Sequence, residues 1–548
     1  MSVETTLLFI LAGVAVVVAI RWVANRSGLP AAALLTLIGI LYAVLPGPNI
    51  ELEPEIVLTL ILPPLLYNAA LDSSLLDIRR NLRTVISLSV VLVLVTALLI
   101  GAGFHFLVAG ATMAAGVALG AAVAPPDPVA ALAVGKKVGL PRNLITLVQG
   151  EGLLNDATAL TLLSVAVSAA VGGHFSFATT VGEFVLSAAG GVIAGIIVAY
   201  AVRASRPIQR DPLIANAISL ATPFVAYVLA EQVHVSGVLA VVVAGLIVGH
   251  DTPRLGSGAS RLQVSAVWRL VDFLLEGLVF LLIGQQLPWV IEGLSEYKTS
   301  TIVGAVAISV GITLLLRPLF LYVTQLLPLS MHTRLGGDPN SEKNSARREQ
   351  ALDGREITAL SWAGTRGVIT LAAVFTIPTE TRAHLPFPDR DLLLFCAFAV
   401  VLVTLVGQGL TFAPLVRRLG LRANENDDAR ERNEARSASA QAALDRLDEI
   451  DQDPHDDVED HAIESMRKQL GTRLERYRRR IDLLDQAESD ELPVSPQYEA
   501  ALRVRRSVID AQRDELLRWR DAGQLTDEGL RILERELDHE ERLLPDRR

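Results

Sequence analysis

A neighbouring amide and carboxyl group, Asn155 and Asp156, lie inside an otherwise apolar stretch of this chain. Asp156 is about twelve residues from the start of this stretch, which spans residues 144–171. Carboxylate and amide oxygens are the ligands that hard cations prefer, and an isolated carboxylate is costly to bury away from water. Asp156 can therefore hold either a proton or a dehydrated cation, but not both at once.

A second set of charges accompanies this pair. Glu151 precedes Asn155 by four residues, which places both side chains on one face of a helix. Arg366 lies deep in another apolar stretch, and a lone arginine within a membrane needs a partner. We predict that Glu151 and Arg366 form a structural clamp between two helices, bridged by Asn155. This pairing leaves Asp156 as the uncompensated carboxyl group; a direct transport role for Glu151 or Arg366 is the alternative.

Two apolar stretches cannot be continuous helices. One contains Pro125-Pro126-Asp127-Pro128 and the other contains Gly364-Thr365-Arg366-Gly367. Proline removes a backbone donor, and unpaired backbone groups at membrane depth are tolerated only where protein or water satisfies them. Paired broken helices in corresponding halves of a chain are the best sequence indication of a transporter's binding site. We therefore expect Asp127 to be a site residue or a helix cap, with Pro126 and Thr365 as accessory positions.

Other polar residues in the apolar stretches have roles that the sequence leaves open. Glu276 is either a packing partner or an accessory site residue, and Asn68 either lines a cavity or bonds to a neighbouring helix. We expect Arg317 to extend its side chain to the cytoplasmic surface. The one cysteine, Cys396, excludes an internal disulfide and a cysteine metal site. No nucleophile or metal-ligand group accompanies the buried acids, so we expect neither an enzyme nor a cofactor.

The elements that must position these residues are membrane-spanning helices, each of about 20 apolar residues. The chain is 51% hydrophobic, and it contains thirteen candidate spans. They cover residues 5–21, 31–46, 54–71, 84–108, 111–134, 144–171, 177–202, 212–232, 236–250, 267–290, 300–325, 356–378 and 391–416. This pattern predicts an all-α polytopic membrane protein. An odd count with one linking helix suits an inverted repeat, in which the two broken helices correspond.

The distribution of Lys and Arg between the spans predicts the orientation of the chain. Loops after odd-numbered spans hold 19 basic residues, whereas the N-terminus and the loops after even-numbered spans hold only Lys298, Arg382 and Arg390. Cytoplasmic loops carry an excess of basic residues. We therefore expect a multi-pass protein with its N-terminus outside and its C-terminal tail in the cytoplasm.

The last part of the chain, residues 421–548, differs from the apolar domain of residues 1–420. It holds 34 acidic and 23 basic residues, a net charge of −11, whereas the rest of the chain has a net charge of +1. This acidic balance argues against nucleic acid as a partner. We predict a linker over Asp427–Asp460 followed by solvated amphipathic helices. A dimerising or regulatory role for this tail is the alternative.

Three segments, in this order, resemble the signature sequences of the monovalent cation/proton antiporters. They are Pro126-Asp127-Pro128-Val129, the run from Glu151 to Asp156, and the run from Trp362 to Gly367. The resemblance covers about residues 1–420 and is to the branch of the bacterial NhaP-type proteins and the animal sodium/proton exchangers. It implies two crossed broken helices, a core that slides against a separate dimerisation domain, and a homodimer embedded in lipid in the plasma membrane.

The resemblance also implies a function. It implies that Asp156 carries both the cation and the proton by alternating access, that Asp127 helps, and that the Asn155–Asp156 pair makes exchange electroneutral. Related antiporters often have a serine where this chain has Gly152. The expected ions are H⁺ and Na⁺, or K⁺ or Li⁺ in its place. The alternatives are a K⁺-preferring antiporter and a cation channel.

Overall fold

The computed structural model describes residues 3–45, 54–108, 111–172, 177–205, 208, 211–254, 257–326, 352–381, 385–422, 425–451, 457–485 and 496–542. In these residues the regular structure is helical, apart from one isolated β-bridge between Glu380 and Pro386. The predicted all-α fold is therefore confirmed. The chain divides into two compact units, Met1–Ala423 and Asn424–Arg548.

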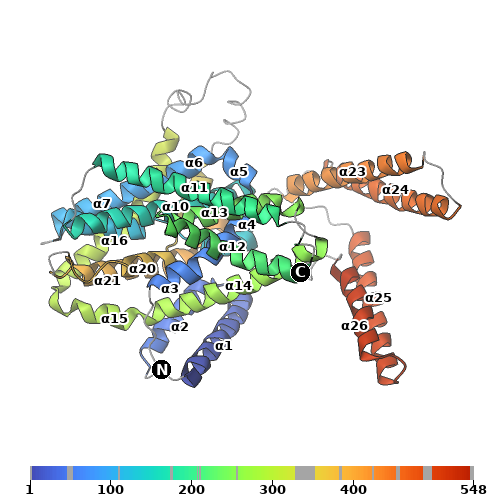
Figure 1. Cartoon of the computed structure of the whole chain (residues 1–548), viewed down its shortest axis with the longest axis horizontal. Coiled ribbons are helices and arrows are strands. Elements are labelled where there is room, and N and C mark those ends of the chain that lie inside the picture. The colour runs from blue at the N-terminus through green and yellow to red at the C-terminus, as the bar shows by residue number, and fades with distance from the viewer. Residues whose placement is uncertain are drawn as a thin grey trace, which may run out of the picture. The chain divides into compact units, whose positions relative to one another are not determined.

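The first unit consists of packed helices (Figure 1). Short π-helical turns interrupt some of them. Its described elements are α1 (Val3–Ser27), α2 (Ala31–Ala43), α3 (Pro54–Ile56), η1 (Val57–Ile61), α4 (Leu62–Leu71), α5 (Leu75–Arg80), α6 (Leu82–Ile86), η2 (Ser87–Val91), α7 (Leu92–Leu107), α8 (Met113–Val123), α9 (Pro128–Val138), α10 (Arg142–Ala170), α11 (Phe177–Ala204), α12 (Pro212–Gln232), α13 (Gly237–Asp251), η3 (Thr252–Arg254), α14 (Gly258–Gln285), α15 (Leu287–Glu292), η4 (Gly293–Glu296), α16 (Thr299–Leu326), α19 (Gly354–Trp362), α20 (Val368–Phe375), α21 (Arg390–Leu402), η5 (Val403–Gln408) and α22 (Gly409–Leu419). Within the described residues, each predicted span falls on one helix or on a consecutive series of them. Eight of the helices in this part of the chain are long and apolar enough to cross a membrane. The count of thirteen crossings stays a prediction.

These helices pack as two groups. One group contains α7, α8, α10, α16, α20 and α21, and the other contains α2, α4, α11, α12, α13 and α14. Contacts are extensive within each group, whereas contacts between the groups are few and come mainly from α10 and α20. A sparse interface of this kind permits one group to move against the other. The division into a sliding core and a dimerisation domain, which the family resemblance implied, stays a prediction.

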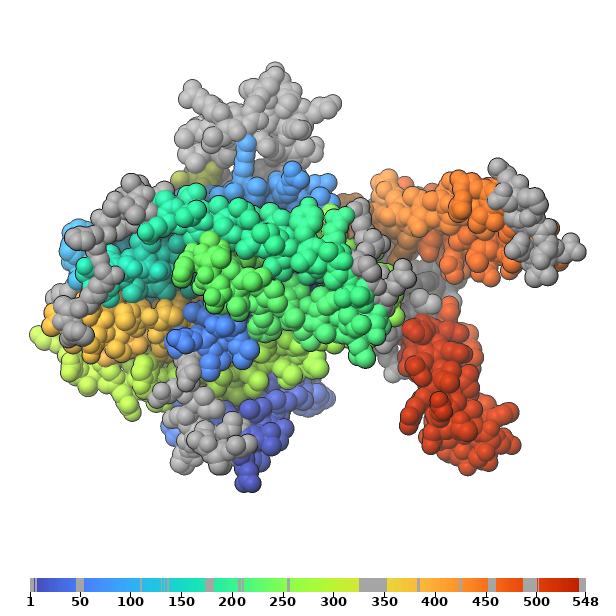
Figure 2. Space-filling model, viewed as in Figure 1, coloured from blue at the N-terminus to red at the C-terminus, as the bar shows by residue number. Residues whose placement is uncertain are grey.

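The face of the first unit in Figure 2 is covered largely by α11 and α12, which contact each other. Both helices expose large apolar side chains over much of their length. The exposed set includes Val185, Leu186, Ile193, Ile197 and Tyr200 on α11 and Leu213, Val225, Val228 and Leu229 on α12. A contiguous apolar surface is unusual on a protein that is surrounded by water. It is typical of helices that face lipid.

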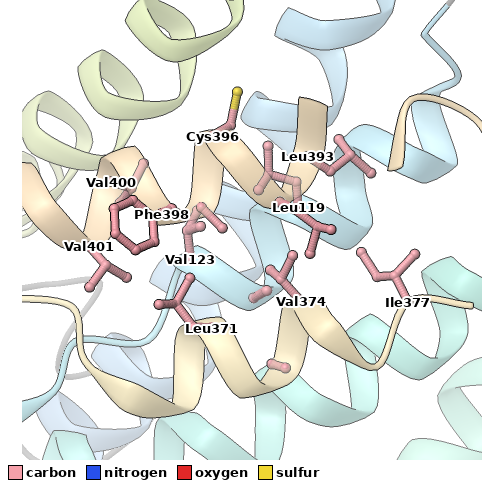
Figure 3. Packing of buried hydrophobic residues seen from close by; sticks show 14 of the residues in the cluster. Leu119, Val123, Leu371, Val374, Ile377, Leu393, Cys396, Phe398, Val400 and Val401 are labelled. Atoms are coloured by element: carbon pink, nitrogen blue, oxygen red, sulfur yellow. The ribbon is translucent and has the colours of Figure 1, made fainter. Parts of the chain in front are cut away.

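The largest apolar cluster joins α8, α20 and α21. Figure 3 shows Leu119 and Val123 of α8 lying between Leu371 and Val374 of α20 and Phe398 of α21, and all five side chains are buried. Small residues make α8 thin enough to fit here, since alanine and glycine supply most of its other positions. This packing fixes the inner ends of α8 and α20, where both helices are interrupted.

Both predicted helix breaks are confirmed. The chain leaves helical geometry between the end of α8 at Val123 and the start of α9 at Pro128. It does so again between the end of α19 at Trp362 and the start of α20 at Val368. Pro128 is tolerated because it occupies the first turn of α9, where its missing N–H group would have no helical partner.

The second unit contains two helical hairpins. One pairs α23 (Glu425–Ile450) with α24 (Asp457–Asp485), and the other pairs α25 (Pro496–Asp521) with α26 (Asp527–Arg542). We predicted a linker over Asp427–Asp460, but most of this segment belongs to the helix α23, so the predicted linker was wrong. Large apolar residues are rare in α23, but its buried face is built from Ala429, Asn433 and Ala440. Alanine is the best helix former and allows close approach of a second helix.

Candidate functional site

The two interrupted segments contact each other directly through their backbones. The N–H group of Asp127 donates to the carbonyl oxygen of Thr365 at 2.7 Å. In return, the hydroxyl group of Thr365 donates to the carbonyl oxygen of Asp127 at 2.9 Å. Each break therefore satisfies backbone groups that the other leaves unpaired, which the interior of a membrane protein requires.

Asp127 is the N-cap of α9. Its Oδ1 accepts a hydrogen bond from the N–H group of Val129 at 2.9 Å. Aspartate is among the preferred N-cap residues because it satisfies one of the free donors of a helix start. The other carboxylate oxygen lies against Gly367, where a Cβ atom would be only 1.7 Å from Oδ2. The position of this carboxylate therefore requires glycine at residue 367.

Replacing Gly367 by alanine is expected to destabilise the protein. The added methyl group collides with the Asp127 carboxylate, and overpacking of this kind typically costs about 1–3 kcal/mol. Thermal unfolding of the purified protein in detergent measures the effect. The matched control is Gly311→Ala in α16, where a Cβ atom meets nothing within 4 Å. Equal unfolding temperatures for the two variants would contradict the tight contact at Gly367.

Asn155 attaches α10 to the first break. Its Nδ2 donates to the carbonyl oxygen of Pro126 at 3.0 Å, and the residue is 0% exposed. Its Oδ1 is buried and has no hydrogen-bond partner in the described part of the chain. Buried acceptors of this kind are rare in native proteins and call for an explanation. The hydrogen bond from Nδ2 fixes the orientation of the amide group, so Oδ1 can accept a cation or a hydrogen bond from water.

Asp156 follows on the same helix and is 4% exposed. Within the residues that the structure describes, its carboxyl group has no ion-pair partner, and the charge that acts on it is that of Asp127. Gly152, one turn earlier, brings α10 close to the first break, because a Cβ atom there would lie 2.5 Å from Cγ of Pro128. The structure thus brings Asp127, Asn155 and Asp156 together.

The predicted pairing of Glu151 with Arg366 is wrong. Glu151 instead pairs with Arg317 of α16: Nη1 of the arginine donates to Oε1, and Nη2 donates to Oε2 at 2.8 Å. Both side chains are buried, with 1% of the glutamate and 4% of the arginine exposed. The third donor, Nε of Arg317, bonds to the carbonyl oxygen of Leu360 at 3.1 Å. Arg317 therefore does not extend to the cytoplasmic surface as expected.

Arg366 bonds to backbone carbonyl groups instead of to a carboxylate. Its Nε donates to the carbonyl oxygen of Val123 at 2.6 Å, and its Nη1 donates to that of Gly364 at 2.8 Å. Val123 is the last residue of α8, and the C-terminus of a helix attracts positive charge because its carbonyl groups are unpaired. Arg366 therefore stabilises the broken helices, but through their backbone.

Sequence reasoning missed Arg317 because it lies next to Pro318 in a long apolar helix, where snorkelling was the simpler interpretation. No signal in the sequence indicated this contact, which Gly364 permits in the folded protein. A Cβ atom at that position would lie 2.8 Å from Cδ of Arg317, so glycine leaves the space through which the arginine reaches Glu151.

The two remaining predicted positions lie on the second helix group. Asn68 is buried on α4, a helix that contacts α10. Glu276 is partly buried on α14 and interacts electrostatically with Arg21, Asp272 and Asp127. Neither side chain has a hydrogen bond to Asp156 among the described residues. Their accessory roles stay predictions.

Known proteins resemble this chain along most of its length. A family model described as the transmembrane sodium/hydrogen exchanger matches residues 12–418. A protein of Mycobacterium bovis named as an uncharacterized Na⁺/H⁺ exchanger is 33% identical over 537 residues, which are 98% of this chain and 95% of the relative. A sodium, potassium, lithium and rubidium/H⁺ antiporter of Bacillus subtilis is 32% identical over 403 residues, which are 71% of this chain and 58% of the relative.

A solved structure provides the comparison of folds. The sodium proton antiporter MjNhaP1 from Methanocaldococcus jannaschii superimposes on this chain with a TM-score of 0.58 and 18% sequence identity. The superposition covers 76% of this chain and 99% of that structure. At this level of identity the comparison shows a shared fold.

Proposed function

Because this chain belongs to the sodium/hydrogen exchanger family, we propose that it exchanges sodium ions for protons across the plasma membrane, with Asp156 as the carrier of both. The observation that carries this proposal is the surroundings of Asp156. Its carboxyl group is buried and has no ion-pair partner among the described residues, and it follows Asn155, whose buried Oδ1 has no hydrogen-bond partner there. This arrangement supports a site in which one carboxylate and one amide oxygen receive a single cation.

The chemistry of exchange follows from competition at this group. A protonated Asp156 is neutral and stable away from water, whereas an ionised Asp156 needs a cation to replace its lost hydration. A bound cation would be held by the carboxylate of Asp156 and by Oδ1 of Asn155, both of which are oxygen ligands suited to a hard ion. Because proton and cation exclude each other, each inward passage of one is coupled to outward passage of the other.

The charges around the site favour exchange of one cation for one proton. Glu151 and Arg317 compensate each other, Asn155 is neutral, and the Asp127 carboxylate is engaged as a helix cap. One titrating carboxyl group per cycle makes the exchange electroneutral.

In our proposal, alternating access is a displacement of one helix group against the other, in a homodimer with its N-terminus outside and its tail in the cytoplasm. Sodium is the first candidate, and potassium and lithium are the alternatives, since the Bacillus subtilis relative is named for all three.

The proposal is tested by proton flux in proteoliposomes that contain the purified protein and a pH-sensitive dye. An outward gradient of Na⁺, K⁺ or Li⁺ is expected to acidify the lumen with at least one of these cations. For an electroneutral exchange, the rate is unchanged when valinomycin and potassium clamp the membrane potential, in the assays driven by Na⁺ or Li⁺. Absence of flux with all three cations would overturn the proposed function, and a rate that follows the clamped potential would overturn the stoichiometry.

A further inference from the structure

Hydrogen bonds hold the second helix break from two directions. One of them comes from Thr404, a residue that the sequence did not predict as part of any site. The backbone N–H group of Arg366 donates to Oγ1 of Thr404 at 3.0 Å. Thr404 is 0% exposed and lies on η5, between α21 and α22. Its own hydroxyl proton goes to the carbonyl oxygen of Val400 at 2.8 Å. The hydroxyl group is therefore oriented by its own helix so that a lone pair faces the break.

The peptide group between Thr365 and Arg366 is thereby bonded at both ends. Its carbonyl oxygen accepts from the N–H group of Asp127 at 2.7 Å, and its N–H group donates to Thr404. Neither end has a helical partner, because this peptide lies between α19 and α20. Losing one of the two bonds would leave a buried group unpaired and free the peptide plane to rotate.

The orientation of this peptide bears on Asp127. The backbone of Asp127 bonds to Thr365 in both directions, and its carboxylate lies against Gly367. Rotation of the peptide group would therefore displace the Asp127 carboxylate, which is the charge that acts on Asp156. A chain of three contacts leads from the Thr404 hydroxyl group to the proposed carrier.

Thr404 lies within the π-helical turn η5 (Val403–Gln408), and such turns are frequent at functional sites. A second π-helical turn, η2, follows the same pattern. There the buried hydroxyl group of Ser89 donates to the backbone carbonyl oxygen of Glu151 at 3.1 Å. In both places a hydroxyl group within a π-helical turn bonds to the backbone of a buried charged residue, Arg366 or Glu151.

We propose that Thr404 is a positioning residue for ion exchange. It fixes the Thr365–Arg366 peptide and, through it, the Asp127 carboxylate beside Asp156. This inference rests on the function proposed above. It assigns to Thr404 an effect on cation affinity that would not arise from a purely structural threonine.

The test compares four variants in the proteoliposome assay. Thr404→Val removes the acceptor at nearly constant volume, Thr404→Ala removes it with less crowding, and Thr404→Ser keeps it. The control is Thr96→Val on α7, where the buried hydroxyl group donates to the carbonyl oxygen of Leu92 in its own helix at 2.6 Å and bonds to no other helix among the described residues. We expect the KM for the transported cation to rise about ten-fold in Thr404→Val and Thr404→Ala, as small misplacements at a site can do. Thr404→Ser and the control should stay near wild type.

A second readout separates this inference from the proposed function. Cation-dependent thermal stabilisation of the detergent-solubilised protein reports binding without requiring exchange. The cation concentration for half-maximal stabilisation should rise by the same factor as KM, with a smaller change in maximal rate. Absence of flux in the wild type would overturn the proposed function. If folded Thr404→Ala keeps the wild-type KM and the wild-type half-maximal cation concentration, the proposed role of Thr404 is wrong. It is also wrong if KM rises as much in Thr96→Val as in Thr404→Val.

Discussion

Replacing Asp156 by asparagine is expected to abolish cation-coupled proton flux completely and to leave the unfolding temperature unchanged or higher. An amide of the same shape can neither release a proton nor compensate the charge of a bound cation. Removing an unpaired buried carboxyl group also removes a cost of folding, because such a group is less favourable in the interior than in water. Proton flux in proteoliposomes and thermal unfolding in detergent measure the two effects.

The control for this variant is Asp77→Asn on α5. It makes the same chemical change at a carboxylate that is 28% exposed and pairs with the exposed Arg80. Exposed ion pairs contribute about 0–1 kcal/mol, so this variant should retain both flux and stability. Residual coupled flux in Asp156→Asn would mean that another group carries the proton. A large fall in its unfolding temperature would mean that Asp156 is a structural residue.

Removing one member of the Glu151–Arg317 pair is expected to produce the largest loss of stability. In Arg317→Met, the Glu151 carboxylate stays buried without its two hydrogen bonds, and an uncompensated buried charge typically costs about 3–5 kcal/mol. A loss of this size lowers the unfolding temperature by roughly 3–6 °C in a protein of this length, because the entropy of unfolding grows with the number of residues. The measurement is thermal unfolding in detergent, supported by the yield of folded protein after extraction from membranes.

The double variant Glu151→Gln with Arg317→Met distinguishes a lost charge partner from lost packing. With both charges gone, no uncompensated group stays in the interior, and most of the lost stability should return. Arg203→Met is the surface control, because that arginine pairs with Asp251 and is 55% exposed. A double variant as unstable as Arg317→Met alone would show that the arginine acts through packing. A loss in Arg203→Met equal to that in Arg317→Met would contradict the importance of burial.

Several features of the fold follow from local composition alone. Apolar runs long enough to span a bilayer predicted the helices, and three prolines around Asp127 predicted one break. Glycines on both sides of Arg366 predicted the other break. The depth of Asn155 and Asp156 in an apolar stretch indicated the site, since a carboxyl group there is costly unless it has a role. Each of these inferences needs only residues that are neighbours in the chain.

The pairing of groups across helices depends instead on how the helices pack. Two arginines in apolar stretches, Arg317 and Arg366, could have paired with Glu151. The packing of α16 brings Arg317 to it, because Gly364 leaves space for the arginine side chain. Thr404 gave no signal, since its proposed role depends on a hydrogen bond to a backbone group 38 residues away in sequence. Pairing of this kind follows from the relative rotation and depth of packed helices. Those quantities are set by the side chains of the whole interface, so no single stretch of sequence contains them.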